Sequence, residues 1–325
     1  MDFFSVDYRA GRAAFLNAAA ADGLGVTSRL HPVATGRDGG PLFLDTVEIG
    51  TRAAAKALLV ISGTHGVEGY FGSAAQTAFL RRRVAVPDET KVVLLHALDP
   101  YGFSWNRRGD ENNVDVNRNF VDHACPPDNP VYESLAGTIA LDEDVGEREL
   151  AAYAAAHGGA AAVQAALSRG QYRHPDGLFY GGGAPSWSQA MLFDVLAEEL
   201  RGVESLIVLD LHTGLGAFGE SAILAEDSPQ SAAFRRIRSI WPAVEPSGAA
   251  ALRPFGQIGP ALAARLPEVT FATLEIGTLP PLEIFRALRR KDGLGAAFCP
   301  DSPVWRKKAL AAAEGALASA VAALG

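Results

Sequence analysis

The chain has 325 residues, of which 48% are hydrophobic, and a formal net charge of −8 at pH 7. Acidic and basic residues are interspersed, so the sequence predicts no binding to nucleic acid or to an anionic membrane surface. No apolar run approaches the roughly 20 residues that cross a bilayer, and the N-terminus lacks the basic and apolar segments of a secretory signal. The two cysteines, Cys125 and Cys299, show neither metal nor disulfide spacing, which fits a reducing compartment. We therefore expect a cytoplasmic protein, although a processed secreted chain would begin in a similar way.

Helical and strand-like hydrophobic patterns alternate along the chain. The predicted elements are, in chain order, helix 8–21, strand 42–49, strand 57–62, helix 72–83, strand 92–97, helix 145–168, helix 186–201, strand 206–211, helix 228–240, strand 269–276, helix 281–290 and helix 302–324. Apolar and polar residues alternate only loosely in strand 42–49, which predicts that this strand lies at an edge of the sheet. The glycines at 158 and 159 should interrupt helix 145–168. Because no linker or repeat breaks the alternation, we predict one α/β domain over residues 1–325, with a mixed, mostly parallel sheet and helices on both faces.

Two of these strands end in a histidine and a glycine turn. Strand 57–62 runs into a turn that carries His65 and Glu68, and strand 206–211 runs into His212. Histidine nitrogen and carboxylate oxygen are ordinary zinc ligands, and a catalytic zinc site has three protein ligands. Because ligands in open α/β sheets bind beyond the carboxyl ends of the strands, we expect these three residues to hold one Zn²⁺ ion. The alternative is that each histidine is a hydrogen-bonded structural residue.

Residues 106–120 form a loop rich in arginine and asparagine, too polar to belong to the core. Guanidinium groups bind carboxylates in bidentate fashion and stabilise developing oxyanions. Arginines beside a zinc site would therefore bind an anionic substrate, whereas an isolated arginine would simply be solvated. No glycine-rich phosphate loop follows a strand, which argues against a nucleotide-binding protein.

Together these motifs resemble the carboxypeptidase A-like zinc metallocarboxypeptidase superfamily, which also includes the aspartoacylase and succinylglutamate desuccinylase deacylases. The resemblance rests, in the superfamily's chain order, on His65-Gly66-Val67-Glu68, Val114-Asp115-Val116-Asn117-Arg118-Asn119-Phe120, His212 and Thr273-Leu274-Glu275-Ile276-Gly277. It spans residues 57–278, about two-thirds of the chain. The sequence from His65 to Gly69, with Asp99-Pro100-Tyr101-Gly102, is similar to a little-characterised bacterial branch.

The resemblance implies a phosphorylase/hydrolase-like fold and a role for each matched residue. His65, Glu68 and His212 would bind one zinc ion, and Glu275 would be the general base that activates the attacking water. Arg108, seven residues before Asp115, would polarise the scissile carbonyl, while Asn117 and Arg118 would hold the terminal carboxylate of the substrate. Asp210, two residues before His212, is either a partner of that histidine or an ordinary buried aspartate.

The expected function is that of a zinc-dependent hydrolase that cleaves an amide bond next to a free carboxylate. We expect a metallocarboxypeptidase acting on a small peptide, with an N-acyl amino acid deacylase as the alternative. The superfamily's carboxypeptidases place a tyrosine between the third ligand and the glutamate, and none occurs between His212 and Glu275. Tyr180 either replaces it or is a packed loop residue. A non-catalytic protein with the same pocket is the rival interpretation, and the sequence does not reveal the oligomeric state.

Overall fold

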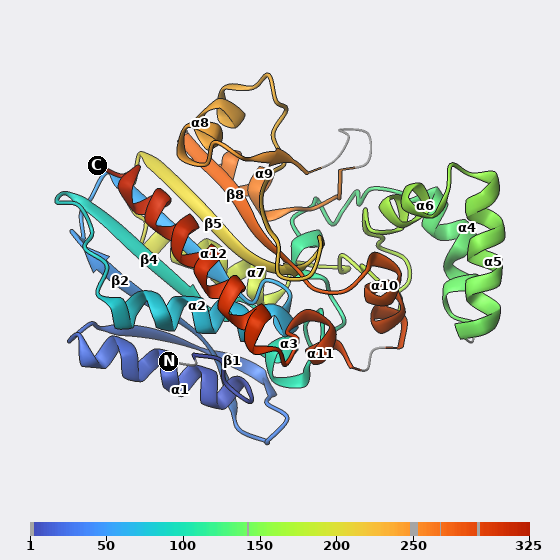
Figure 1. Ribbon diagram of the computed structural model, residues 1–325, viewed down its shortest axis with the longest axis horizontal. Coiled ribbons are helices and arrows are strands. Elements are labelled where there is room, and N and C mark those ends of the chain that lie inside the picture. The colour runs from blue at the N-terminus through green and yellow to red at the C-terminus, as the bar shows by residue number, and fades with distance from the viewer. Residues whose placement is uncertain (1–2, 142, 248–252, 267, 291–292) are drawn as a thin grey trace.

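The computed structural model describes residues 3–141, 143–247, 253–266, 268–290 and 293–325. The strands of that part of the chain are β1 (Val26–Thr35), β2 (Pro41–Gly50), β3 (Lys56–Ser62), β4 (Thr90–His96), β5 (Ser205–Gly214), β6 (Ser221–Ala225), β7 (Glu245–Pro246) and β8 (Glu268–Gly277). They form one sheet in the order β1-β2-β4-β3-β5-β8-β6-β7 (Figure 1). The central strands β4, β3, β5 and β8 are parallel, and β6 pairs parallel with β7. The antiparallel pairs are β1 with β2, β2 with β4, and β6 with β8. The predicted α/β class with a mixed, mostly parallel sheet is confirmed.

Helices cover both faces of the sheet, as predicted. The α-helices of the described residues are α1 (Tyr8–Ala21), α2 (Gly69–Arg82), α3 (Pro100–Trp105), α4 (Pro130–Ile139), α5 (Glu143–Ala156), α6 (Ala160–Leu167), α7 (Trp187–Glu198), α8 (Ala232–Ile240), α9 (Ile258–Ala263), α10 (Pro281–Arg290), α11 (Leu294–Phe298) and α12 (Pro303–Ala322), and two 3₁₀-helices are η1 (Gly66–Glu68) and η2 (Val116–Arg118). Apolar residues of α1, α2, α8 and α12 pack against one face of the sheet, and those of α7 and α9 against the other. Figure 1 shows α12 crossing in front of the sheet beside α2.

The central strands are buried on both sides because their side chains alternate between the two layers of helices. In β3, Leu58 and Val60 belong to the apolar cluster beneath α2 and α12, whereas Leu59 and Ile61 belong to the cluster beneath α7. A strand that is buried on both faces reads as a continuous apolar run. This is why the sequence pattern located β3 so closely.

The strand at residues 42–49 was wrongly predicted to lie at an edge. The observed strand, β2, pairs with β4 on one side and with β1 on the other. The outer strand β1 was not predicted, because most of its side chains are exposed and it contains Pro32. Proline is tolerated on an edge strand, where its missing N–H disrupts no inner ladder.

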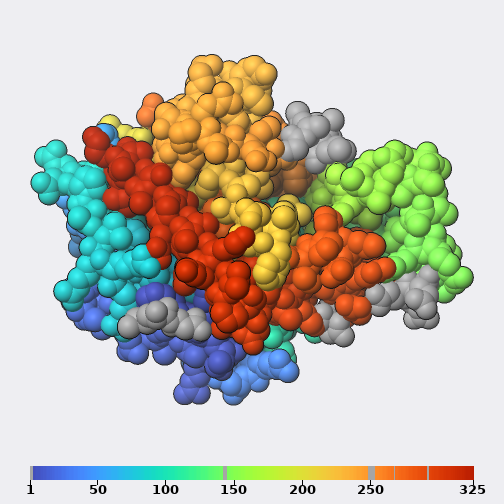
Figure 2. All heavy atoms as spheres, viewed as in Figure 1, coloured from blue at the N-terminus to red at the C-terminus, as the bar shows by residue number. Residues whose placement is uncertain are grey.

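The helices α4, α5 and α6 form a lobe to one side of the sheet (green in Figures 1 and 2). The lobe has its own apolar cluster, which includes Tyr132, Leu135 and Leu167 and is joined by Phe285 of α10. The predicted interruption of helix 145–168 is confirmed, because α5 ends at Ala156 and α6 begins at Ala160. In the described part of the chain, no helix combines the length and the apolar composition needed to cross a membrane.

Candidate active site

The metal-capable side chains meet at the carboxyl ends of β3 and β5. A tight turn after β3 presents His65 and then Glu68 at the end of η1, and the neighbouring strand β5 presents His212. Two glycines allow this turn. Gly63 adopts a φ of +67°, which favours glycine, and a Cβ on Gly66 would lie 2.2 Å from the backbone of α3. The backbone is thus packed too closely for any other residue at that position.

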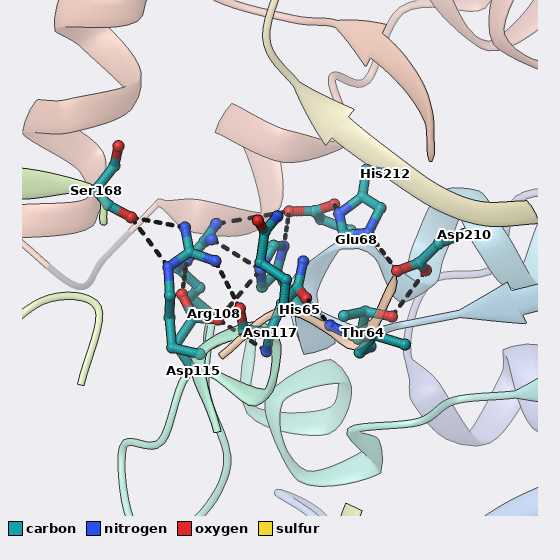
Figure 3. A network of polar contacts seen from close by, with 12 residues as sticks. Thr64, His65, Glu68, Arg108, Asp115, Asn117, Ser168, Asp210 and His212 are labelled. Carbon is teal, nitrogen blue, oxygen red and sulfur yellow. Dashed lines mark hydrogen bonds and ion pairs between the residues drawn. The ribbon is translucent and has the colours of Figure 1, made fainter. Parts of the chain in front are cut away.

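The donor atoms of the three predicted ligands converge. His65 Nδ1 lies 2.8 Å from Glu68 Oε1, and His212 Nδ1 lies 3.1 Å from Glu68 Oε2. One donor atom from each residue lies within 4.8 Å of the other two, and all three side chains are buried. Two imidazole nitrogens and a carboxylate form a donor set that suits Zn²⁺. Figure 3 shows the three side chains pointing toward one another.

The far nitrogen of each histidine faces a buried carboxylate. Asp115 Oδ1 lies 3.3 Å from His65 Nε2, and Asp210 Oδ2 lies 2.7 Å from His212 Nε2. The Thr64 hydroxyl donates a hydrogen bond of 2.8 Å to the other oxygen of Asp210 (Figure 3). At His212, the carboxylate beside Nε2 favours a proton there and leaves Nδ1 free to bind a metal. His65 Nε2 also faces Arg108 Nη2 at 2.7 Å, and a guanidinium can only donate. The sequence suggested Asp210 for this position but gave no sign that Asp115 would reach His65.

At this cluster, attraction between opposite charges shifts the pKa values of Glu68 and His212 more than burial does. Burial raises the pKa of Glu68, but the positive charges of His65 and His212 outweigh it and hold that pKa well below its ordinary value. Burial lowers the pKa of His212, but Asp210 and Glu68 outweigh it and hold that pKa well above its ordinary value. The carboxylates therefore stabilise positive charge where the donor atoms converge. A bound cation would supply that charge.

Glu275 lies directly opposite His212 in the parallel pair of β5 and β8. Its Oε1 accepts a hydrogen bond of 2.8 Å from the backbone N–H of Leu215. Burial, followed by the negative charge of Glu68, raises the pKa of Glu275 to about 8. A carboxyl group with a pKa in this range can accept a proton and return it near neutral pH.

Arg108 reaches the same cluster from the loop that follows α3. Its Nε donates to Asp115 Oδ2 at 2.9 Å, and its Nη2 lies 2.7 Å from His65 Nε2. Its Nη1 is 3.8 Å from Glu68 Oε1. The guanidinium is therefore fixed beside the metal-capable atoms (Figure 3), where an arginine can offset negative charge on a reacting oxygen.

Asn117 and Arg118 are buried in η2, directly after Asp115, the aspartate that holds Arg108. Asn117 Oδ1 accepts a hydrogen bond of 3.0 Å from the N–H of Ile258. Arg118 donates to the backbone carbonyl of Ser168 through Nε and Nη2, and to the carbonyl of Asn117 through Nη1. These bonds fix its position but leave other N–H groups of the guanidinium for a ligand.

The prediction that residues 106–120 stay outside the core because they are polar was wrong. Asp115, Asn117, Arg118 and Asn119 are all buried. Each finds partners inside the protein: Asn119 Nδ2, for example, donates to the backbone carbonyl of Gly181 at 2.8 Å. Polar groups can be buried when their hydrogen bonds are satisfied, and composition alone does not reveal that.

Tyr180 lies on the glycine-rich loop that packs against this segment. Its backbone carbonyl accepts a hydrogen bond of 2.7 Å from the N–H of Asp115. Its side chain is half-buried, and within the described residues its hydroxyl group forms no hydrogen bond that would fix it as a catalytic group. The hydrogen bond that joins Tyr180 to Asp115 is thus made by its backbone carbonyl.

Comparison with known proteins gives a family and a set of structural neighbours. The profile of a family described as "Protein of unknown function (DUF2817)" matches residues 4–312. No curated protein sequence matches the chain.

Several solved structures share the fold of this chain, and some of them are described as metallopeptidases or carboxypeptidases. Bovine thrombin-activatable fibrinolysis inhibitor, solved with tick carboxypeptidase inhibitor, has a TM-score of 0.56 and 10% identity, and the match covers 99% of this chain and 97% of that chain. A candidate metallopeptidase from Shewanella amazonensis SB2B has a TM-score of 0.52 and 12% identity over 98% and 94% of the two chains. Carboxypeptidase A from Helicoverpa armigera has a TM-score of 0.50 and 13% identity over 95% and 74%. The resemblance to the metallocarboxypeptidase superfamily is confirmed at the level of the fold.

Proposed function

The chain belongs to the DUF2817 family of proteins of unknown function, and we propose that it is a zinc-dependent hydrolase that cleaves an amide bond next to a free carboxylate. The observation that carries this proposal is the convergence of His65, Glu68 and His212, with Glu275 opposite His212 on the adjacent strand. The fold, shared with metallocarboxypeptidases, supports the same conclusion.

Each residue of the site has a separate task in this hydrolysis. Zinc, held by the two histidines and Glu68, would supply Lewis-acid assistance. Glu275 takes a proton from the attacking water and returns it to the leaving amine. Arg108 offsets the charge that develops on the carbonyl oxygen, and Asn117 with Arg118 binds the carboxylate next to the scissile bond.

We favour a metallocarboxypeptidase acting on small peptides, because both members of the carboxylate clamp, Asn117 and Arg118, are present and buried. The absence of a tyrosine between His212 and Glu275 favours the second candidate, an N-acyl amino acid deacylase. The test is to incubate the zinc-loaded protein with N-blocked dipeptides and with N-acyl amino acids, and to measure release of the free amino acid. Turnover of neither class by protein that holds zinc would contradict the proposal and favour a non-catalytic binding protein.

Replacing Arg118 and replacing Arg108 should impair hydrolysis in different ways. Arg118 is proposed to hold a carboxylate that stays charged throughout the reaction, so Arg118→Ala should mainly raise KM. Arg108 is proposed to meet an oxygen whose charge appears only during the reaction. Arg108→Ala should therefore lower kcat and kcat/KM together, by roughly 10²–10³-fold. Steady-state kinetics on a substrate and on its carboxamide analogue separates the two roles, because the amide lacks the charge that Arg118 binds.

On the carboxamide, Arg118→Ala should change little, whereas Arg108→Ala should remain severely impaired. The exposed Arg52, in the turn between β2 and β3, offers a control, since Arg52→Ala should leave both substrates unaffected. Thermal unfolding is measured alongside, because Arg118 also holds the Ser168 carbonyl. If both active-site variants respond alike to the two substrates, the separate roles are wrong.

Zinc affinity should depend on Asp210. In Asp210→Asn the amide group can donate to His212 Nε2, which favours the tautomer whose proton blocks Nδ1. We expect the Kd for zinc to rise roughly 10–100-fold, as for other carboxylates that orient a metal-binding histidine. Competition with a chelator measures this Kd. Asp301→Asn, at an aspartate that is 92% exposed, is the matched control, and an unchanged Kd in Asp210→Asn would refute the role.

A further inference from the structure

Arg118, the cation of the proposed carboxylate clamp, is bound to the C-terminal end of helix α6. Its Nε and Nη2 both donate to the backbone carbonyl of Ser168, at 3.0 and 2.7 Å (Ser168 is labelled in Figure 3). Ser168 directly follows α6, and the last carbonyl groups of a helix lack partners within the helix. The partial negative charge of this helix end also favours a cation. The position of the guanidinium therefore depends on one helix end of the lobe.

The turn after α6 contacts the aliphatic part of Arg118 as well. Gly170 adopts a φ of +101°, and a Cβ at this position would lie 2.9 Å from Arg118 Cδ. The backbone of the turn is thus packed against the side-chain stem, while the carbonyl of Ser168 binds the guanidinium. A shift of residues 168–170 would move both contacts together.

A single buried side chain, that of Asn129, fixes this turn. Its Nδ2 donates to the backbone carbonyls of Ala166 and Gly170, at 2.9 Å each, which are two positions before and two positions after Ser168. Its Oδ1 accepts a backbone N–H and caps the start of helix α4. Asn129 is only 5% exposed, so water cannot readily replace these hydrogen bonds. One amide group thus joins the start of α4 to the turn that holds Arg118.

We propose that Asn129 is a positioning residue for Arg118, and that the lobe of α4, α5 and α6 holds this guanidinium in the orientation that binds the substrate's carboxylate. The inference rests on the proposed function, in which Arg118 binds that carboxylate. Hydrogen bonds to the protein use three of the five N–H groups of Arg118. The remaining two can meet a carboxylate only when the guanidinium is correctly oriented, because hydrogen bonds weaken steeply as their angle departs from linearity.

Asn129→Asp tests the amide group without removing the helix cap. Aspartate caps a helix as well as asparagine does, but it lacks the two N–H donors and places an oxygen against the carbonyls of Ala166 and Gly170. The turn should loosen, and the Nε–H of Arg118 should exchange with water roughly tenfold faster, since buried groups that lose their partners destabilise the local structure. Hydrogen exchange of this Nε–H, followed by NMR, measures the effect without a substrate.

Two further variants complete the exchange experiment. Asn129→Ser also keeps a residue that caps helices and adds no charge, so it should accelerate exchange in the same direction. Asn17→Asp, at an exposed asparagine of α1, makes the same chemical change away from the lobe. In this matched control the Nε–H of Arg118 should exchange at the wild-type rate.

The kinetic readout depends on the carboxylate of the substrate. For an N-blocked dipeptide, Asn129→Asp should raise KM roughly tenfold and leave kcat close to wild type, because a misplaced guanidinium binds ground and transition states equally less well. For the carboxamide analogue it should change little. The double variant Asn129→Asp/Arg118→Ala should be no worse than Arg118→Ala alone, since Asn129 acts through Arg118. A residue that only stabilised the fold would instead add its own effect.

The outcomes separate this inference from the proposed function. Unchanged exchange of the Arg118 Nε–H in both Asn129 variants, or equal impairment on the dipeptide and its carboxamide, would overturn the role of Asn129 and leave the proposed function intact. Equal turnover of the two compounds by the wild type would refute carboxylate binding by Arg118, and this inference with it. If the wild type turns over neither compound, the proposed function fails, and the exchange rate still decides whether Asn129 fixes Arg118.

Discussion

Replacing His212 by alanine should remove zinc and activity together. The substitution leaves only two of the three protein ligands, and a catalytic zinc site needs three. It also leaves Asp210, which faces His212 Nε2 at 2.7 Å, without its partner in a buried position. Metal analysis after dialysis should find less than stoichiometric zinc, and hydrolysis should fall to background. His65→Ala should give the same result, because its Nδ1 is the other nitrogen of the donor set.

An exposed histidine provides the control for this experiment. His157 stacks on Tyr153 at the end of α5, far in sequence from the site, so His157→Ala should retain zinc and turnover. Circular dichroism establishes that each variant is folded. If wild-type protein holds no zinc under metal-replete conditions, or if His212→Ala retains a full equivalent, the proposed metal centre is wrong.

Glu275→Gln should separate metal binding from catalysis. Glutamine keeps the shape of the side chain, and its carbonyl oxygen can still accept the hydrogen bond from Leu215. It cannot accept a proton. We therefore expect zinc to remain bound while kcat falls roughly 10²–10⁴-fold, the range for loss of a general acid–base group. Single-turnover kinetics, with metal content measured on the same sample, checks both expectations.

The same strand offers a matched substitution for this prediction. Glu268 lies at the exposed start of β8, so Glu268→Gln changes the same chemical group on the same element away from the site. It should behave as wild type. Turnover near the wild-type value in Glu275→Gln would show that another residue is the base.

The central strands could be predicted from the sequence because of how they are buried. β3, β5 and β8 are covered on both faces, so each reads as an apolar run that ends near a polar side chain. Parallel strands place these ends at one edge of the sheet, which is why His65, His212 and Glu275 could be expected together. β1 and the helix α4 were missed: β1 is largely exposed, and α4 belongs to a lobe whose apolar cluster is completed by distant Phe285.

The partners of the site residues could not be predicted in the same way. Asp115 reaches His65 across 50 positions of sequence, and Ser168 binds Arg118 across the same number. No local sequence pattern predicts such contacts, because they depend on how loops fold back over the strand ends. The sequence could therefore name the reactive side chains, but not the residues that orient them.

One aspartate serves two functional side chains at once. Oδ1 of Asp115 faces His65, and Oδ2 holds Arg108. A histidine of the donor set and the arginine beside it therefore share one anchor, and displacing either side chain alters the environment of the other. In thermodynamic terms, metal binding at His65 and ligand binding at Arg108 are coupled, and such coupling is reciprocal. A ligand that binds Arg108 more tightly when the metal is present must, to the same degree, strengthen the hold of the protein on that metal.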